Sequence, residues 1–94
     1  MSNGAPLHPD EAKRLIRQVL RHGDLRWTRH AMRELEKDEL DLPDAVNVLR
    51  GGVVEPAEWE GGQWRYRVRT TRMIVVITFV DDGLRVITAW RLGP

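Results

Sequence analysis

The stretch that decides the fold is residues 64–91, WRYRVRTTRMIVVITFVDDGLRVITAWR. Trp64 to Arg69 alternates apolar and charged side chains, Met73 to Val80 is almost continuously apolar, and Leu84 to Arg91 alternates again. A period of two is typical of a strand with one buried face, and a short apolar run is typical of a strand buried on both faces. Asp82-Gly83 is a tight-turn signal. The stretch therefore predicts an antiparallel meander with Met73 to Val80 at its centre.

The residues before the meander carry apolar side chains at helical spacing. Pro9 marks the start of a first helix, because proline is tolerated at the first helical position. Thr28 is the expected N-cap of a second helix that runs to about Lys37. Pro43 begins a third, short helix, which Gly51-Gly52 ends. The first half of the chain is therefore predicted to be helical.

Between the third helix and the meander, Val53 to Glu60 predicts a weak edge strand because it contains Pro56, and Gly61-Gly62 predicts a hairpin turn. We therefore expect an α+β fold in which two to three N-terminal helices pack on one face of a three- to four-stranded antiparallel sheet. A chain of 94 residues supports one hydrophobic core. We expect a single domain over residues 8–94, after a flexible terminus over residues 1–7.

The composition excludes several function classes. The chain has no cysteine, which rules out disulfides, thiolate zinc sites and thiol nucleophiles. Its apolar runs are far shorter than the roughly 20 residues that span a bilayer, and its first residues carry no export signal, so a cytoplasmic protein without a membrane partner is expected. The three histidines have no metal-ligand spacing, and no glycine-rich phosphate loop precedes a helix. We expect neither a metal nor another cofactor.

The net charge of +1 hides three blocks of opposite charge. The sum is +5 over residues 11–33, −7 over residues 34–60 and +4 over residues 61–94. Thirteen of the fifteen cationic side chains are arginines, whose guanidinium groups bind phosphate or carboxylate through two parallel hydrogen bonds. The basic blocks favour a polyanion such as RNA, and the acidic block favours a basic protein. Mutual neutralisation of the blocks within the fold is an equally open alternative.

The first strand of the meander carries a row of arginines. Side chains at alternate positions of a strand lie about 6.6 Å apart on one face. Regular alternation therefore groups Arg65, Arg67 and Arg69 on one side of the strand and leaves Tyr66 on the other. Such a row fits a polyanion, although an ordinary solvated sheet face with arginines chosen for their apolar stems is an open alternative.

The last strand extends this basic face if it also alternates regularly. Arg91 then joins the row of three arginines, and the opposite side of the sheet is left for the helices. This alternation groups Arg85, Ile87, Ala89 and Arg91 on the open face, and Leu84, Val86, Thr88 and Trp90 on the helix-covered face.

His30 is the histidine best placed for proton transfer, because it lies on the second helix with Arg33 three residues later. An imidazole titrates near neutral pH and serves as a general base or acid. A structural histidine at the helix surface is the alternative.

Four stretches, taken in order, resemble a small bacterial family of uncharacterised domains. Its signature is an H-A-x-x-R helix, a helix ending V-L-x-x-G and an R-Y-x-V strand, and that family is similar to the MqsR-type and BrnT-type toxins of the RelE-like group of messenger RNA interferases. The likeness covers about residues 10–92. The matching stretches are residues 28–33, TRHAMR; 44–52, DAVNVLRGG; 65–69, RYRVR; and 87–91, ITAWR.

The resemblance implies a RelE-like toxin fold and a metal-independent endoribonuclease that acts on messenger RNA, free or on the ribosome. It also implies a cognate antitoxin. In such enzymes a base takes the proton from a ribose 2′-OH, which attacks the adjacent phosphorus while cations stabilise the phosphoryl charge. Residue by residue, it implies catalytic roles for His30, Tyr66, Arg67 and Arg91, and substrate binding by Arg33, Arg65 and Arg69.

Two other functions stay open at this point. The first is a non-catalytic module that binds nucleic acid or protein, in which residues 34–60 dock a basic partner. The second is a structural dimer joined through the edge strand Val53 to Trp59.

Overall fold

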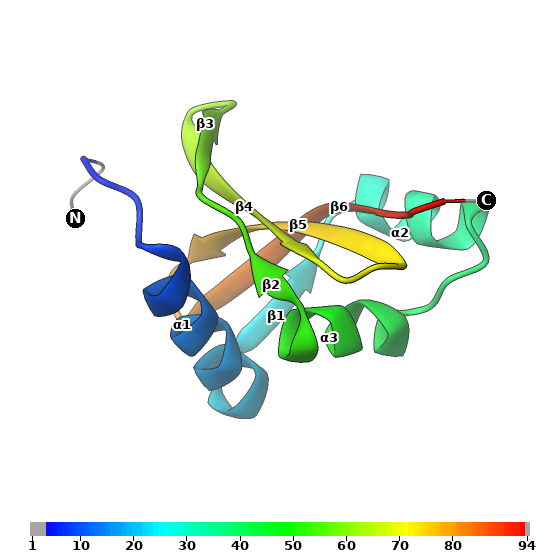
Figure 1. Ribbon diagram of the computed structural model, residues 1–94, viewed down its shortest axis with the longest axis horizontal. Helices are drawn as coiled ribbons and strands as arrows, with labels where there is room; N and C mark the ends of the chain where they lie inside the picture. Colours follow the sequence, from blue (N-terminus) through cyan, green and yellow to red (C-terminus); the bar gives the residue numbers. More distant parts are fainter. Residues whose placement is uncertain (1–3, 94) are drawn as a thin grey trace.

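Residues 4–93 of the computed structural model form three helices and a mostly antiparallel six-stranded sheet (Figure 1). The strand order is β1-β6-β5-β4-β2, and β3 pairs with β4 outside this path. The α+β class is confirmed, with two more strands than the upper number predicted. The elements are α1 Pro9–His22, β1 Asp24–Trp27, α2 Arg29–Lys37, α3 Leu42–Gly51, β2 Val53–Val54, β3 Glu58–Glu60, β4 Gln63–Arg69, β5 Met73–Val80 and β6 Gly83–Arg91.

The helix starts follow from local capping. The Thr28 side chain accepts a hydrogen bond from the Ala31 backbone N–H, as expected of an N-cap. At α3 the prediction was one residue late, because Asp41 and Asp44 form a capping box and the helix begins at Leu42. Two backbone N–H groups are satisfied in this way, and this outweighs the usual effect of a following proline on Leu42.

Strand β1 was not predicted. It pairs in parallel with the first half of β6, from Asp24 opposite Gly83 to Trp27 opposite Val86. Its four residues are too few to show a period, and its partner lies almost sixty residues later in the chain, so only the tertiary fold reveals it. Because β1 leads directly into Thr28, it fixes where α2 begins.

All three helices contribute to one hydrophobic core with the sheet. Figure 1 shows α1 and α3 below the sheet and α2 at the far end of β6. The central strand β5 is buried on both faces from Met73 to Thr78, as predicted. The side chains of Met73, Val75 and Ile77 lie on the face that the helices cover and join the core. The core cluster comprises Ala12, Ile16, Val19, Ala31, Leu35, Ala45, Val48, Leu49, Val54, Tyr66, Val68, Met73, Val75, Ile77, Leu84, Val86 and Ala89.

A β-bulge in β6 changes the predicted faces of the last strand. Val76 pairs with Thr88 and Ile77 pairs with Val86, so Ile87 is an extra residue. The Thr28 hydroxyl donates a hydrogen bond to the Ile87 carbonyl, 2.8 Å away, and holds the bulge. Beyond the bulge the phase of the strand is reversed. Leu84, Val86 and Ala89 are fully buried, whereas Thr88 and Trp90 are only half-buried.

The predicted edge strand is split into β2 and β3 around Pro56, which cannot donate to a ladder. Strand β3 and the start of β4 form a hairpin arm that extends above the rest of the sheet (Figure 1). Near the start of the chain, the Leu7 backbone N–H donates to the Tyr66 hydroxyl at 2.8 Å. The flexible terminus predicted over residues 1–7 thus includes an anchored residue, and residues 1–3 lie outside the described part.

Candidate functional site

The arginine row of β4, defined as Arg65, Arg67 and Arg69, lies on one face of the strand as predicted. The intervening Tyr66 and Val68 are buried in the core on the other face. In the part of the chain that the structure describes, no helix packs on the arginine side, because the buried residues of α1, α2 and α3 join the core on the opposite side. The row therefore faces away from the helices.

Each arginine of the row has a carboxylate partner from the chain segment just before β4. Arg69 Nη1 lies 3.1 Å from Glu55 Oε2 and is hydrogen-bonded to it. Arg67 lies 3.8 Å from Glu58, and Arg65 lies 3.8 Å from Glu60. Within residues 4–93, the row is thus neutralised by three glutamates. It is not the unpaired row of cations, open to a polyanion, that the alternation suggested.

The pairing follows from the hairpin that the sequence already indicates. Gly61 and Gly62 have positive φ angles of 64° and 79°, which allow the chain to reverse between β3 and β4. Antiparallel pairing then brings the acidic β3 against the basic β4. The alternative in which the charge blocks neutralise each other holds for this pair of segments.

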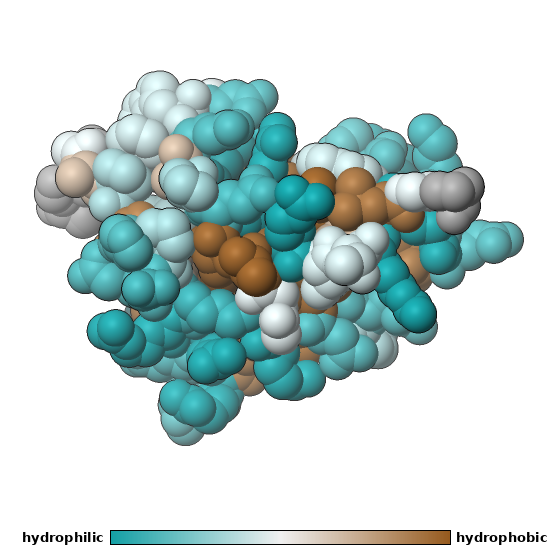
Figure 2. Space-filling model, viewed as in Figure 1, coloured by the Kyte–Doolittle hydropathy of each residue, from teal (hydrophilic) through white to brown (hydrophobic). Residues whose placement is uncertain are grey.

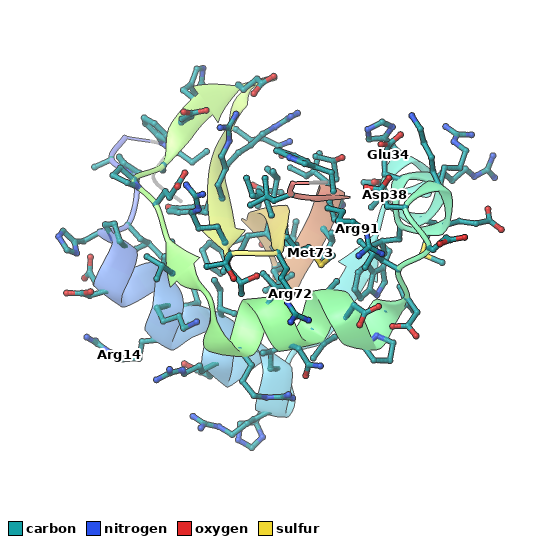
Figure 3. All side chains as sticks on the ribbon, turned by 45° about the vertical axis from the view of Figure 1, so that its right-hand side comes forward. Arg14, Glu34, Asp38, Arg72, Met73 and Arg91 are labelled. Carbon is teal, nitrogen blue, oxygen red and sulfur yellow. The ribbon has the colours of Figure 1, made fainter. Side chains whose placement is uncertain are left out.

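Arg91 does not lie with the β4 row, which corrects the prediction of one shared face. It is two residues after the buried Ala89 and directly opposite Met73 of the core, so it faces the helix side of the sheet. Its guanidinium group donates to the Asp38 carbonyl at 2.7 Å, and its backbone N–H donates to the Asp38 carboxylate at 2.9 Å. Figure 3 shows Arg91 between Asp38 and Met73.

A pocket of about 450 Å³ opens on this side, between α3, the β4–β5 turn and the end of β6. We call it the Arg72–Arg91 pocket. Figure 3 shows Arg72 above α3, on the same side of the sheet as Arg91. Within the described residues neither guanidinium group forms an ion pair. The residues that line the Arg72–Arg91 pocket are Glu39, Leu40, Asp44, Asn47, Val48, Thr70, Thr71, Arg72, Met73 and Arg91.

Two carboxylates also line this pocket, and they differ in their surroundings. Asp44 Oδ2 accepts the Asp41 backbone N–H at 2.9 Å and is used in capping α3. Glu39 is exposed, and within residues 4–93 its side chain has no ion-pair or hydrogen-bond partner. Glu39 also has a φ angle of 59°, at the left-handed position after α2 that glycine usually occupies. A carboxylate therefore stands where backbone stability favours glycine.

The predicted proton-transfer residues are not brought together with the arginines. Tyr66 is 3% exposed and lies in the core, with its hydroxyl bonded to Leu7. His30 is exposed in the first turn of α2, and it does not line the Arg72–Arg91 pocket. Arg33 lines a separate, largely apolar pocket of about 320 Å³ beside the start of α3. Arg91 is therefore the one predicted site residue that lines the Arg72–Arg91 pocket.

Sequence reasoning missed Arg72, Thr70 and Thr71, because they lie in the turn between two strands and follow no period. The Leu92 backbone N–H donates to the Arg72 carbonyl at 2.7 Å, which places the turn next to the end of β6. The length of the predicted meander was the available signal, since an antiparallel pair brings the start of β5 against the end of β6.

Within residues 4–93, no group of three or more His, Asp or Glu side chains has a geometry that would hold a metal ion. None of the helices there is long and apolar enough to cross a membrane.

The chain was also compared with known proteins. No protein family, no curated protein and no solved structure matches it.

Proposed function

We propose that the chain is a toxin-like, metal-independent endoribonuclease of RelE-like fold, with messenger RNA, free or on the ribosome, as substrate. In this proposal the scissile phosphodiester binds in the Arg72–Arg91 pocket and not on the arginine row of β4. A cognate antitoxin, the partner implied by the sequence resemblance, would cover this pocket. The observation that carries the proposal is that Arg72 and Arg91, whose guanidinium groups form no ion pair within residues 4–93, line one pocket together with Thr70 and Thr71.

The charges in the pocket suit this chemistry. Cleavage by an adjacent 2′-OH builds negative charge on the phosphoryl oxygens, and guanidinium groups stabilise it through two parallel hydrogen bonds. Arg72 and Arg91 supply these donors, and Thr70 and Thr71 supply neutral ones. A volume of about 450 Å³ lies within the range of small-ligand sites and accommodates one nucleotide.

Glu39 is the group that we assign as the general base. It takes the proton of the 2′-OH as that oxygen bonds to phosphorus, and the bond to the 5′-oxygen of the next nucleotide breaks. The products are a 2′,3′-cyclic phosphate and a 5′-hydroxyl, and the leaving oxygen receives a proton from water or from the protonated Glu39. Tyr66 is not assigned a role because it is buried, and His30 is not assigned one because it lies outside the pocket.

The test is cleavage of a messenger RNA in EDTA, alone and with ribosomes. We expect fragments with 2′,3′-cyclic phosphate ends, and we expect Arg72→Gln and Arg91→Gln each to lower the rate about 10²- to 10³-fold. Glu39→Gly should abolish cleavage while raising the free energy of unfolding by up to about 1 kcal/mol, because glycine suits the positive φ angle.

Arg67→Gln is the matched control, since it removes one arginine that already has a carboxylate partner. It should retain nearly the full rate. The proposal is wrong if the unmodified protein yields no fragments with or without ribosomes, or if Arg67→Gln is as damaging as Arg91→Gln.

A non-catalytic RNA-binding module is the second candidate function. The observation that favours it is that His30 and Tyr66, the expected proton carriers, are separated from the pocket by their positions on α2 and in the core. Salt-dependent RNA binding without fragments, under every condition of the cleavage test, would support this function.

A further inference from the structure

Helix α1 presents three arginines that neither the fold nor the proposed active site uses. Its apolar positions Ala12 and Ile16 are fully buried, so the helix is tied to the core on one side. We define the α1 arginine stripe as Arg14, Arg17 and Arg21, which are all exposed on the opposite side. Their spacing of three and four residues puts them on one face of the helix, over about 10 Å.

The stripe lacks carboxylate partners of the kind that neutralise β4. Residues 12–23 contain no aspartate or glutamate, and the exposed Asp10, one turn before Arg14, lies near His8 instead, with its carboxylate 3.9 Å from His8 Nδ1. Among residues 4–93, no ion pair involves any of the three arginines. Figure 2 shows that the surface over α1 is mainly hydrophilic, and Figure 3 shows Arg14 pointing away from the body of the molecule. The guanidinium groups of the stripe are therefore available to a ligand.

The surroundings of Lys13 add to the positive potential there. Lys13 Nζ donates to the carbonyls of Leu49, at 3.2 Å, and of Gly52, so the negative end of the α3 dipole is already occupied by a cation. Burial, and after it the positive charge of Arg17, lowers the pKa of Lys13. A repulsion of this kind is expected where cations gather without counter-charges, and an incoming anion relieves it.

The chemistry of the stripe distinguishes between three anionic partners. A membrane-surface helix inserts its apolar face, but the apolar face of α1 is buried in the core. A protein interface needs an apolar or aromatic centre, and the exposed side chains of α1 are all polar or charged, with Asp10 and Glu11 in the first turn and Arg, Gln and His beyond it. A phosphate backbone needs only spaced cations, preferably arginines. The stripe fits the last of these.

We infer that the α1 arginine stripe binds the phosphate backbone of an RNA strand outside the Arg72–Arg91 pocket. The inference rests on the proposed function for its choice of RNA. Helix α3 packs against both α1 and β5, so one strand of RNA that leaves the pocket along α3 reaches the stripe. The stripe supplies affinity, and the pocket supplies the chemistry.

The test measures binding separately from cleavage. The probe is a fluorescent single-stranded 2′-O-methyl RNA, which has no 2′-OH to attack, at a length above the site size of about 4–16 nucleotides. Fluorescence anisotropy is recorded over a series of salt concentrations. We expect the triple variant Arg14→Gln, Arg17→Gln, Arg21→Gln to reduce the magnitude of the slope of log K against log salt by about 2, which is three contacts at about 0.7 each.

The matched control removes the same charge from the arginine row of β4, as Arg65→Gln, Arg67→Gln, Arg69→Gln. This variant should change the slope much less, because its arginines already have glutamate partners. Equal slopes for the two triple variants, or an unchanged slope for the α1 variant, would overturn the inference. The single variant Arg17→Gln, with an expected change of about 0.7, serves if the triple variant does not fold.

Two further outcomes separate this inference from others. Polyglutamate that competes with the RNA at equal charge concentration would overturn the inference in favour of an acidic protein partner. Binding through α1 by a protein that cleaves no RNA would refute the proposed nuclease and leave this inference intact, since the 2′-O-methyl probe reports binding alone.

Discussion

Strands β4 and β6 both carry arginines at odd-numbered positions, yet Arg91 of β6 lies in a different environment from the three arginines of β4. In β4 the alternation is unbroken, and all three arginines face the open side of the sheet, where glutamates of the preceding segment pair with them. In β6 the bulge at Ile87 reverses the phase, and Arg91 faces the helix side, where its guanidinium group forms no ion pair with any of the described residues. The phase of a strand and the charge of its neighbouring segment therefore decide which arginines are available to a ligand.

The phase reversal in β6 is tested most severely at Ala89. We expect Ala89→Glu to remove cooperative unfolding or to cost about 4 kcal/mol or more, because a carboxylate would be buried in the core without a partner. Chemical denaturation gives the free energy of unfolding.

Thr88→Glu is the control, since Thr88 lies on the open side and a charge there should change stability by no more than about 1 kcal/mol. Regular alternation predicts the reverse order, so a more damaging Thr88→Glu would refute the bulge.

Removal of the Thr28 hydroxyl should cause the next largest loss in the free energy of unfolding. It accepts from the Ala31 N–H and donates to the Ile87 carbonyl at the bulge. Thr28→Val should lower the free energy of unfolding by about 1–3 kcal/mol, because a helix cap is lost and a carbonyl loses its donor. Thr28→Ser keeps the hydroxyl and should cost much less. Thermal and urea unfolding give the two free energies. Equal losses for Thr28→Val and Thr28→Ser would show that the hydroxyl does not hold the bulge.

The neutralisation of β4 can be removed at its acidic side. The triple variant Glu55→Gln, Glu58→Gln, Glu60→Gln leaves the three arginines without carboxylate partners. We expect RNA binding to tighten at low salt and the salt slope to steepen by about 2, as for three new phosphate contacts. The control variant Glu36→Gln, Asp81→Asn, Asp82→Asn removes the same charge elsewhere. A steeper slope in both variants would attribute the change to net charge alone.

The smallest expected effect concerns the individual ion pairs. A double-mutant cycle on Arg69 and Glu55, 3.1 Å apart, should give a coupling of about 0.5 kcal/mol, within the range for exposed pairs. The pair of Arg67 and Glu58, at 3.8 Å, should give less. Both couplings should fall when salt is raised. A coupling that does not respond to salt would indicate packing and not charge.

Much of the fold was predictable because local chemistry decides it. The buried run Met73–Val80 becomes the central strand, Thr28 caps α2, and the glycine pair 61–62 turns the hairpin. Strand β1 was not predictable, since four residues carry no period and their partner is distant in the chain. The faces of β6 were predicted wrongly after Ile87, because one extra residue reverses every side chain that follows.

The candidate site was predictable only in part. The three arginines of the β4 row share one face, as their spacing predicted. Arg91 was named from its residue type and the resemblance, but its spacing placed it on the wrong face. The pocket around Arg72 and Glu39 was not, because it unites a strand turn with the end of a helix. Spacing along one element reports which side chains share a face, but it carries no information on what packs opposite them.

The sequence by itself determined the α+β class, the central strand, the helix caps and the grouping of arginines on β4, since these depend on interactions between residues close in the chain. The neutralisation of the β4 row follows from the local hairpin at Gly61-Gly62, whereas only the tertiary structure places Arg72 and Arg91 at one pocket. The physical reason is that a pocket depends on distances between segments that are far apart in the chain, and these distances are set when β1, β6 and α2 pack together around the bulge.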